Sequence, residues 1–353
     1  MFITGLGTAT PPHRFTQSQC WDALMASGYL PKLSPRSQAI LRKVLRGNNG
    51  ICSRYLAFDD LSEAFAMNPD VLDARFARHA PAVAADAAKR AMRQAEISAG
   101  EVDALVISTC TGYLCPGLTS YVSERLGLRP GVLALDLVGQ GCGAALPNLR
   151  TGEALIASGR ARKVLSVCVE ICSAAMYLDD DPGVLVSACL FGDGAGAAVL
   201  SAEPDSPQRA IEWRTADTVL SPGDRESLRF EKRGGMLRNI LSLDVPEIAA
   251  THVSDVLDRV LGTSGVDRTD IRGWVLHAGG REILAAIQHR LGLSEHDTRW
   301  SAGVLRDHGN VSSPCVYFVL DAALKEGAPG GLWWMSSFGA GFSCHGALLD
   351  VAD

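Results

Sequence analysis

The amino-acid sequence predicts an α/β protein made of two similar halves, with helices on both faces of mostly parallel sheets. Short apolar runs of strand length alternate with segments of helical pattern, and this alternation occurs twice along the chain. A stretch rich in turn-forming residues at 202–208 separates the two occurrences. A length of 353 residues with 47% hydrophobic side chains is ample for a large buried core. We therefore expect an N-terminal half at residues 1–205 and a C-terminal half at residues 206–353.

In the first half, short apolar runs alternate with helical segments. Such runs are typical of parallel strands, because helices cover both faces of a parallel sheet. The expected elements are a strand at residues 102–109, a helix near 118–126, a strand at 132–137, a helix at 143–158 and a strand at 163–169. Residues 15–80 precede them and are expected to form a helical, arginine-rich insertion.

The second half repeats the alternation. Its expected elements are a strand at residues 273–277, a helix at 282–291, a turn at Asn310, a helix at 311–325 and a strand at 331–337. The two halves share this pattern more than they share identical residues, so we infer an internal duplication.

The residue most informative about chemistry is Cys142, in a Gly-Gln-Gly-Cys-Gly turn that joins a predicted strand to a predicted helix. The first amide groups of a helix carry partial positive charge, so a thiolate there should be stabilised and the pKa of the thiol lowered. Gly139, Gly141 and Gly143 remove side chains that would block a substrate. Most cysteines are small buried hydrophobic residues, and only the strand-to-helix turn singles out Cys142 as a nucleophile.

Two later segments supply partners for such a nucleophile. His277 ends a short apolar strand and is followed by glycines, and Asn310 lies just before another apolar helix. An imidazole can take the proton of a thiol, and imidazole and amide N–H groups can together stabilise an oxyanion. Taken alone, His277 could equally be a hydrogen-bonded core residue and Asn310 a helix cap. A Cys/His/Asn site fits acyl transfer.

A competing motif points to a different class of enzyme. Gly139, Gly141 and Ala144 fit a loose G-x-G-x-x-A dinucleotide fingerprint, with Glu170 at the end of the next strand. A nicotinamide-dependent oxidoreductase is therefore an alternative, although it leaves His277 and Asn310 without a role. We interpret Glu170 instead as a buried carboxylate that accepts hydrogen bonds from backbone N–H groups near Cys142.

Composition restricts the partners and the location. A net charge of −6 gives no basic stripe for nucleic acid, and no apolar run is long enough to span a membrane. The cysteines form no C-x-x-C pair and lie mostly in apolar runs, which favours reduced thiols over a disulfide framework. The N-terminus enters a strand-like segment without a charged start or a cleavage site. We expect a cytoplasmic enzyme.

Motifs along nearly the whole chain, taken together, carry a family resemblance. They are Ser53-Arg-Tyr55, Ser108-Thr-Cys-Thr-Gly112, Gly139-Gln-Gly-Cys142, Leu190-Phe-Gly-Asp-Gly194, Asp244-Val-Pro246, His277-Ala-Gly-Gly280, Gly309-Asn310-x-Ser-Ser313 and Phe338-Gly-Ala-Gly341. With these motifs the chain resembles the type III polyketide synthases, the chalcone-synthase-like branch of the thiolase superfamily. The resemblance implies the thiolase fold, a duplicated five-layer α-β-α-β-α architecture.

The resemblance also implies roles and partners. Cys142 would carry the acyl chain, His277 and Asn310 would support decarboxylation and hold the oxyanion, and Phe191 would be an aromatic gatekeeper. The substrates would be malonyl-CoA and a starter supplied by an acyl-CoA or an acyl carrier protein, with no metal or redox cofactor. The family implies a homodimer, with Cys115 at the position that reaches the partner subunit. For the CoA phosphates we select Arg54 and Arg46, because cationic groups suit phosphate.

Departures from the plant enzymes suggest the starter. Where the plant enzymes carry a second gatekeeping phenylalanine, we expect Arg238-Asn239 in this chain, with Asn239 as the substrate contact, so a bulky aromatic is expected to be missing there. The remaining substrate-binding candidates are Thr111, Cys115, Cys172, Ala175, Gly339 and Gly341. Small residues leave space for an apolar chain, so we predict a long-chain fatty acyl starter and an alkylresorcinol or alkylpyrone product. A chalcone- or stilbene-type synthase with an aromatic starter and a single-condensation β-ketoacyl synthase III remain alternatives.

Overall fold

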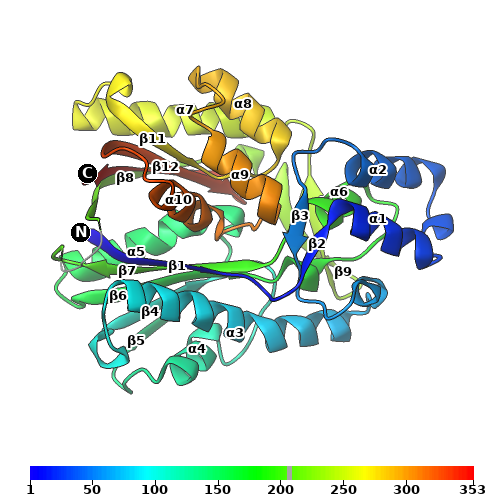
Figure 1. Ribbon diagram of the computed structural model, residues 1–353, viewed down its shortest axis with the longest axis horizontal. Coiled ribbons are helices and arrows are strands. Elements are labelled where there is room, and N and C mark those ends of the chain that lie inside the picture. Colours follow the sequence, from blue (N-terminus) through cyan, green and yellow to red (C-terminus); the bar gives the residue numbers. More distant parts are fainter. Residues whose placement is uncertain (205–208) are drawn as a thin grey trace.

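The computed structural model describes residues 1–204 and 209–353, whose main strands form one large mixed sheet (Figure 1). The strand order is β11-β12-β13-β8-β1-β7-β6-β4-β5. These strands are β1 (Phe2–Ala9), β4 (Ala104–Ser108), β5 (Leu133–Leu137), β6 (Lys163–Glu170), β7 (Gly194–Ser201), β8 (Ile211–Leu220), β11 (Ile271–Leu276), β12 (Gly331–Gly339) and β13 (Ser343–Val351). In the centre, β1 and β8 pair only at Phe2 with Glu212 and Ile3 with Ile211. The sheet therefore separates into two halves joined at one end.

Three helical layers alternate with these two halves of the sheet (Figure 1). Helices α5 (Ala145–Ala157) and α10 (Cys315–Lys325) lie between them and pack in a shared apolar core. The outer face of the first half is covered by α3 (Pro69–Gln94) and α4 (Leu118–Leu126). The outer face of the second is covered by α7 (Val245–Ser264) and α8 (Arg281–Leu291). The predicted five-layer duplicated α/β architecture is thus confirmed.

The strand directions are mixed rather than mostly parallel. Strand β4 is parallel to β5 and β6, and β11 is parallel to β12, as expected for strands joined through helices. The other pairings of the large sheet are antiparallel. The short connection between β12 and β13 shows the reason, because a chain that reverses in a few residues can only pair antiparallel.

Most predicted elements are close to those observed, with one informative shift. The predicted helix at 118–126 coincides with α4, and the predicted strand at 163–169 lies within β6. The predicted helix at 311–325 begins only at Cys315, because residues 310–314 form a turn that ends at Pro314, the N-cap. The predicted boundary at residues 205–206 lies outside the described residues, as does most of the turn-rich stretch 202–208.

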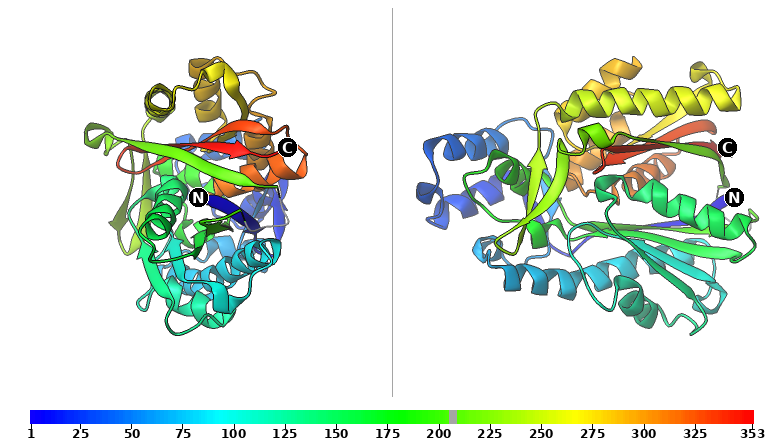
Figure 2. Two further views of the ribbon diagram at one scale, coloured as in Figure 1. Left: turned by 90° about the vertical axis from the view of Figure 1, so that its left-hand side faces the viewer. Right: turned by 180° about the vertical axis from the view of Figure 1, so that it is seen from behind.

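The predicted insertion at residues 15–80 is not wholly helical. It contains α1 (Gln17–Ala26) and α2 (Pro35–Arg46), and also β3 (Ser53–Tyr55), which pairs with β2 (Arg14–Thr16). Its last part is the beginning of α3, which is capped by Asn68. Figure 2 shows α1 and α2 at one end of the molecule.

Three further elements position the site. Helix α6 (Pro182–Leu190) ends at Phe191, α9 (Arg299–His308) leads to Asn310, and β9 (Leu228–Arg233) forms a separate hairpin with β10 (Met236–Leu241). None of the three was predicted. In the part of the chain that the structure describes, no helix combines the length and the apolar character needed to cross a membrane.

Candidate active site

Cys142 lies in a short turn, η4 (Gly141–Gly143), between β5 and α5. The turn needs glycine, because Gly139 and Gly141 have φ values of +84° and +55°. A Cβ atom on Gly143 would lie 3.2 Å from the backbone N of Gly339. The closing loop at Gly339 therefore packs directly on the turn that carries the thiol, and this contact fixes the position of Cys142.

The glycines at residues 139–144 thus allow close packing of the turn, and we do not interpret them as a binding site for the pyrophosphate of a dinucleotide. Gly339 supports the cysteine turn, and Gly341 lies next to Leu220 and Ser343. Neither glycine lines the two cavities described below, so their predicted contact with substrate is replaced by a packing role.

A cavity of about 350 Å³, here called the outer cavity, brings Cys142, His277 and Asn310 together. Cys142 comes from the β5–α5 turn, His277 follows β11, and Asn310 follows α9. Phe191 and Asn239 also line this cavity. The structure therefore places the three residues predicted for catalysis at one site, although they are far apart in the sequence.

Burial determines the protonation of the thiol and the imidazole. It raises the pKa of Cys142 to about 12, although a hydrogen bond that Ser312 Oγ donates to Cys142 Sγ at 3.1 Å acts in the opposite direction. The predicted lowering of this pKa is wrong, because α5 begins only at Ala145 and desolvation dominates. Burial also lowers the pKa of His277 to about 4. A neutral imidazole can accept the proton that the thiol must lose.

His277 and Asn310 have hydrogen-bonding capacity available for a substrate. Among the described residues, neither ring nitrogen of His277 has a hydrogen-bond partner. Asn310 Nδ2 donates to the Gly279 carbonyl at 2.9 Å, and Asn310 Oδ1 accepts from the Ser312 N–H at 2.8 Å. The amide of Asn310 is thus held in place with one N–H free. It is not the cap of α10, because that helix starts five residues later.

A smaller inner cavity of about 30 Å³ adjoins the outer one. Three of the predicted substrate contacts, Thr111, Cys172 and Ala175, line it. Ser187, Phe191 and Asn239 line both cavities, and we call these three residues the neck. The predicted gatekeeper position of Phe191 is thus at the passage between the two spaces.

Phe230 is a lining residue that the sequence analysis missed. It lies on β9 directly opposite Asn239 of β10 and lines the inner cavity. The hairpin therefore does carry an aromatic side chain, on the other strand from the one expected. The paired glycines Gly234 and Gly235, with φ values of +58° and +81°, are a hairpin signal that could have revealed this cross-strand pair.

Two of the remaining predicted residues lie away from both cavities. Arg54 is only 2% exposed and donates to the backbone carbonyls of Ala188 and Phe191. Its predicted contact with CoA phosphates is therefore wrong, because its guanidinium is buried and donates hydrogen bonds to these carbonyls. Cys115 is exposed, next to Pro116, and lines neither cavity of the single chain.

One exposed cation, Arg281, lines the outer cavity, and the predicted Arg46 lies on a helix that borders it. Arg46 is in the last turn of α2, close to Val44, which lines the cavity. Arg281, which was not predicted, begins α8, lines the cavity and donates to the Asn48 carbonyl at 2.7 Å. A cation at a helix N-terminus that borders a cavity suits an anionic group entering there.

Glu170 is fully buried behind the thiol. It accepts from the Cys110 N–H at 3.0 Å and from Thr111 Oγ1 at 2.9 Å, and the Ser313 hydroxyl also donates to it. Side-chain hydroxyls are therefore more important partners than the backbone N–H groups we expected. Burial raises the pKa of Glu170, and these hydrogen bonds partly offset the rise. Its burial leaves it unavailable to a ribose.

A buried histidine beside the cysteine turn makes stability depend on pH. Burial lowers the pKa of His345 from 6.5 to about 4, and its ring lies 3.2 Å from where a Cβ on Gly143 would be. Because the folded state disfavours the charged ring, its stability should fall as the pH drops from 6.5 towards 4. Relative to His345→Gln, the wild type should lose up to about 3 kcal/mol of unfolding free energy over this range. Urea unfolding at several pH values tests this, and a pH-independent difference between the two proteins would contradict it.

Comparisons with known protein families agree with this geometry. Residues 21–219 match the family described as FAE1/Type III polyketide synthase-like protein. Residues 216–350 match the C-terminal domain of chalcone and stilbene synthases.

Individual relatives are similar over nearly the whole chain. The 3,5-dihydroxyphenylacetyl-CoA synthase of Amycolatopsis balhimycina is 30% identical, over 98% of this chain and 92% of the relative. The alpha-pyrone synthesis polyketide synthase-like Pks18 of Mycobacterium tuberculosis is 28% identical, over 99% and 91%. The crystal structure of PKS-I from the brown alga Ectocarpus siliculosus superposes with a TM-score of 0.89 at 28% identity, covering 99% of this chain and 97% of that one.

Proposed function

Because the chain belongs to the type III polyketide synthases, enzymes that condense acyl and malonyl thioesters, we propose that its starter is a long-chain fatty acyl thioester and its product an alkylresorcinol or alkylpyrone. The observation that supports the chemistry best is the convergence of Cys142, His277 and Asn310 in one cavity, with both ring nitrogens of His277 unpartnered.

The first step is loading of the starter. Cys142 attacks the carbonyl carbon of the starter thioester while His277 accepts the proton of the thiol. The oxyanion of the tetrahedral intermediate accepts a hydrogen bond from Asn310 Nδ2. Collapse of the intermediate expels the CoA thiolate, which takes up a proton, and leaves the acyl group on Cys142. The raised pKa of Cys142 and the lowered pKa of His277 favour a neutral thiol and a neutral imidazole before the attack.

The second step is condensation. Malonyl-CoA binds in the outer cavity and loses carbon dioxide, and the electron pair of the broken C–C bond forms an enolate whose oxygen His277 and Asn310 stabilise. The enolate carbon attacks the thioester on Cys142 and the cysteine sulfur leaves. Return of the extended chain to Cys142 allows another round. The reaction calls for CoA thioesters and no further cofactor, and Arg281 and Arg46 are the proposed contacts for the CoA phosphates.

A long starter needs apolar space beyond the neck. The inner cavity meets a further apolar cavity of about 50 Å³ beneath α1 and α2, and Met176 and Ala188 line both. Movement of the flexible Met176 side chain would connect them. Each methylene group that enters contributes about 0.8 kcal/mol. The similarity to a relative named for alpha-pyrone synthesis supports the same product class.

The small inner cavity also favours a second candidate. At about 30 Å³, with Phe230 as one wall, it suits a short starter. The relatives named 3,5-dihydroxyphenylacetyl-CoA synthase support a dihydroxyphenyl product without a long alkyl chain. Incubation with labelled malonyl-CoA and acyl-CoAs of increasing length, followed by mass spectrometry of the products, distinguishes the two. The long-chain proposal fails if short starters are used at least as well as fatty acyl-CoAs.

Enlarging a lining residue should shorten the accepted starter. In Ala175→Phe or Cys172→Phe, the ring would fill the inner cavity, so long acyl-CoAs should lose at least about tenfold in kcat/KM while short ones are spared. Ala175→Gly is the matched control, because it leaves the space open. A chain-length profile that does not move in the phenylalanine variants would show that the starter does not lie there.

We also propose a homodimer that pairs through the β5 edge of the sheet. Strand β5 has one neighbour, and apolar residues around this edge are unusually exposed: Tyr113 77%, Val138 65% and Leu133 40%. Exposed apolar residues at an open strand edge are typical of an interface. Cys115 lies in the same region, where it could reach a partner's cavity. Light scattering should give twice the chain mass of 37.4 kDa, and a fully active monomer would refute the proposal.

The ten unpaired cysteines support a cytoplasmic location, because a reducing compartment keeps thiols free.

A further inference from the structure

The β9–β10 hairpin forms one wall of the neck and of both cavities. Within residues 1–204 and 209–353, its two strands pair only with each other, so the strands of the large sheet do not hold the hairpin in place. One face carries residues that line the cavities, namely Leu228, Phe230, Leu237, Asn239 and Leu241. A two-stranded hairpin alone is marginally stable, so contacts with the rest of the protein must set its position.

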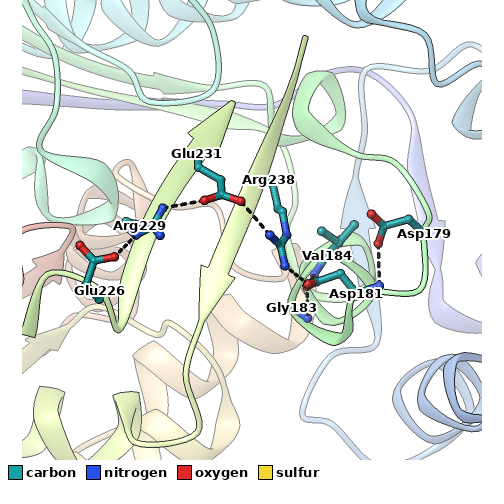
Figure 3. Close-up of polar contacts among 8 residues, drawn as sticks. All are labelled: Asp179, Asp181, Gly183, Val184, Glu226, Arg229, Glu231 and Arg238. Atoms are coloured by element: carbon teal, nitrogen blue, oxygen red, sulfur yellow. Dashed lines mark hydrogen bonds and ion pairs between the residues drawn. The ribbon is translucent and has the colours of Figure 1, made fainter. Parts of the chain in front are cut away.

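The opposite face of the hairpin carries a row of charges that ends on α6 (Figure 3). Glu226 pairs with Arg229 and Arg229 with Glu231, and Arg238 Nη1 donates to Glu231 at 2.7 Å. Arg238 Nη2 then donates to Asp181 Oδ2 at the start of α6. Arg238 and Asp181 are 22% and 21% exposed, so solvent screens this pair less than an exposed one.

Asp181 uses its two carboxylate oxygens for two separate tasks. Oδ1 accepts from the N–H groups of Gly183 and Val184 at 2.9 and 3.2 Å and so caps α6. Oδ2 binds Arg238. One side chain thus connects the hairpin to the first turn of the helix that ends at Phe191.

The neck lies on the other side of the same two elements. Asn239, the residue after Arg238, donates from Nδ2 to Ser187 Oγ of α6 at 2.7 Å. The hairpin backbone also passes close to the helix start, because a Cβ on Gly183 would lie 3.0 Å from the Asn239 carbonyl oxygen. The ion pair and the Asn239–Ser187 bond therefore connect the same two elements, one outside the cavities and one at the neck.

We propose that Arg238 is a positioning residue, which through its ion pair with Asp181 holds the hairpin against α6 and so sets the width of the neck. The inference rests on the proposed use of the inner cavity by the starter and the growing chain. Without the pair, the Asn239–Ser187 hydrogen bond is the remaining side-chain hydrogen bond between hairpin and α6 among the described residues, and the neck then admits chains of more varied length and shape. Discrimination between substrates falls while the chemistry at Cys142 continues.

The test compares four variants with a matched control. Arg238→Gln and Asp181→Asn each remove the ion pair, and the asparagine keeps an oxygen that can cap α6. In the double variant the effects should not add, because both changes remove one interaction. Arg229→Gln is the control, because Arg229 belongs to the same row of charges but does not contact α6. Arg238→Lys should restore part of the wild-type behaviour.

The main readout is acyl transfer to Cys142 from acyl-CoAs of different lengths, followed by intact-protein mass spectrometry. The ratio of the kcat/KM values for the best and the poorest starter should fall at least about threefold in both single variants and not in Arg229→Gln. Malonyl-CoA decarboxylation should stay within about twofold of wild type, whereas a merely unfolded variant would lose both. An unchanged starter ratio in Arg238→Gln and Asp181→Asn, or equal changes in Arg229→Gln, overturns the inference.

The same samples separate this inference from the proposed function. Starter selectivity is measured on the acyl-enzyme and does not depend on iteration. The products of the wild type with malonyl-CoA test the proposed function independently, since it fails if no product contains more than one malonyl unit.

Discussion

Replacing Cys142 with alanine is expected to lower product formation by at least about 10³-fold with every starter. The reason is positional, because Cys142 is the cysteine that lines the outer cavity with His277 and Asn310. Other thiols lie close by, and Cys110 shares Ser312 as a hydrogen-bonding partner. Cys110 cannot replace the nucleophile, since it lies against the Glu170 carboxylate and lines neither cavity. Desolvation also raises its pKa well above the usual value.

The loss should be accompanied by loss of the acyl-enzyme. Mass spectrometry after incubation with an acyl-CoA should show one added acyl group on the wild type and none on Cys142→Ala. Cys52→Ser is the control, because Cys52 is exposed and lies outside both cavities. Retention of product formation by Cys142→Ala would show that another group carries the chain, and the mechanism would have to be abandoned.

The fold and the three residues of the site could be predicted because short sequence patterns indicate them. The two β/α alternations follow from apolar periodicity, and Cys142, His277 and Asn310 each follow an element end marked by glycine. The sheet halves bring these ends together around the middle helical layer. The strand directions were less predictable, since the antiparallel pairings depend on which distant segments meet.

The sequence-based predictions were wrong or incomplete where burial or strand register determines the role of a residue. Arg54 is polar in the sequence, yet it is buried against the carbonyls of Ala188 and Phe191, 134 and 137 residues away. Phe230 lines the inner cavity only because the hairpin register places it opposite Asn239. The pKa of Cys142 depends on desolvation, which no local motif reveals. Each of these properties depends on contacts between segments far apart in the sequence.

Asn310→Ala is expected to slow malonyl-CoA decarboxylation by about 10²- to 10³-fold, the usual cost of losing one oxyanion donor. Starter loading should fall less, because His277 still accepts the thiol proton and donates to the first tetrahedral intermediate. The enolate has no covalent bond to the protein and relies on both donors. Release of carbon dioxide and formation of the acyl-enzyme, measured separately, report the two steps.

A second variant separates the donor role of Asn310 from its structural one. Asn310 Oδ1 accepts from the Ser312 N–H, and Ser312 in turn donates to Cys142, so alanine could disturb the thiol indirectly. Asn310→Asp keeps that acceptor and removes the amide donor, so it should lose decarboxylation as strongly as the alanine variant. If decarboxylation survives in Asn310→Asp, or if loading and decarboxylation fall equally in Asn310→Ala, Asn310 acts by holding Ser312 and not by binding the enolate.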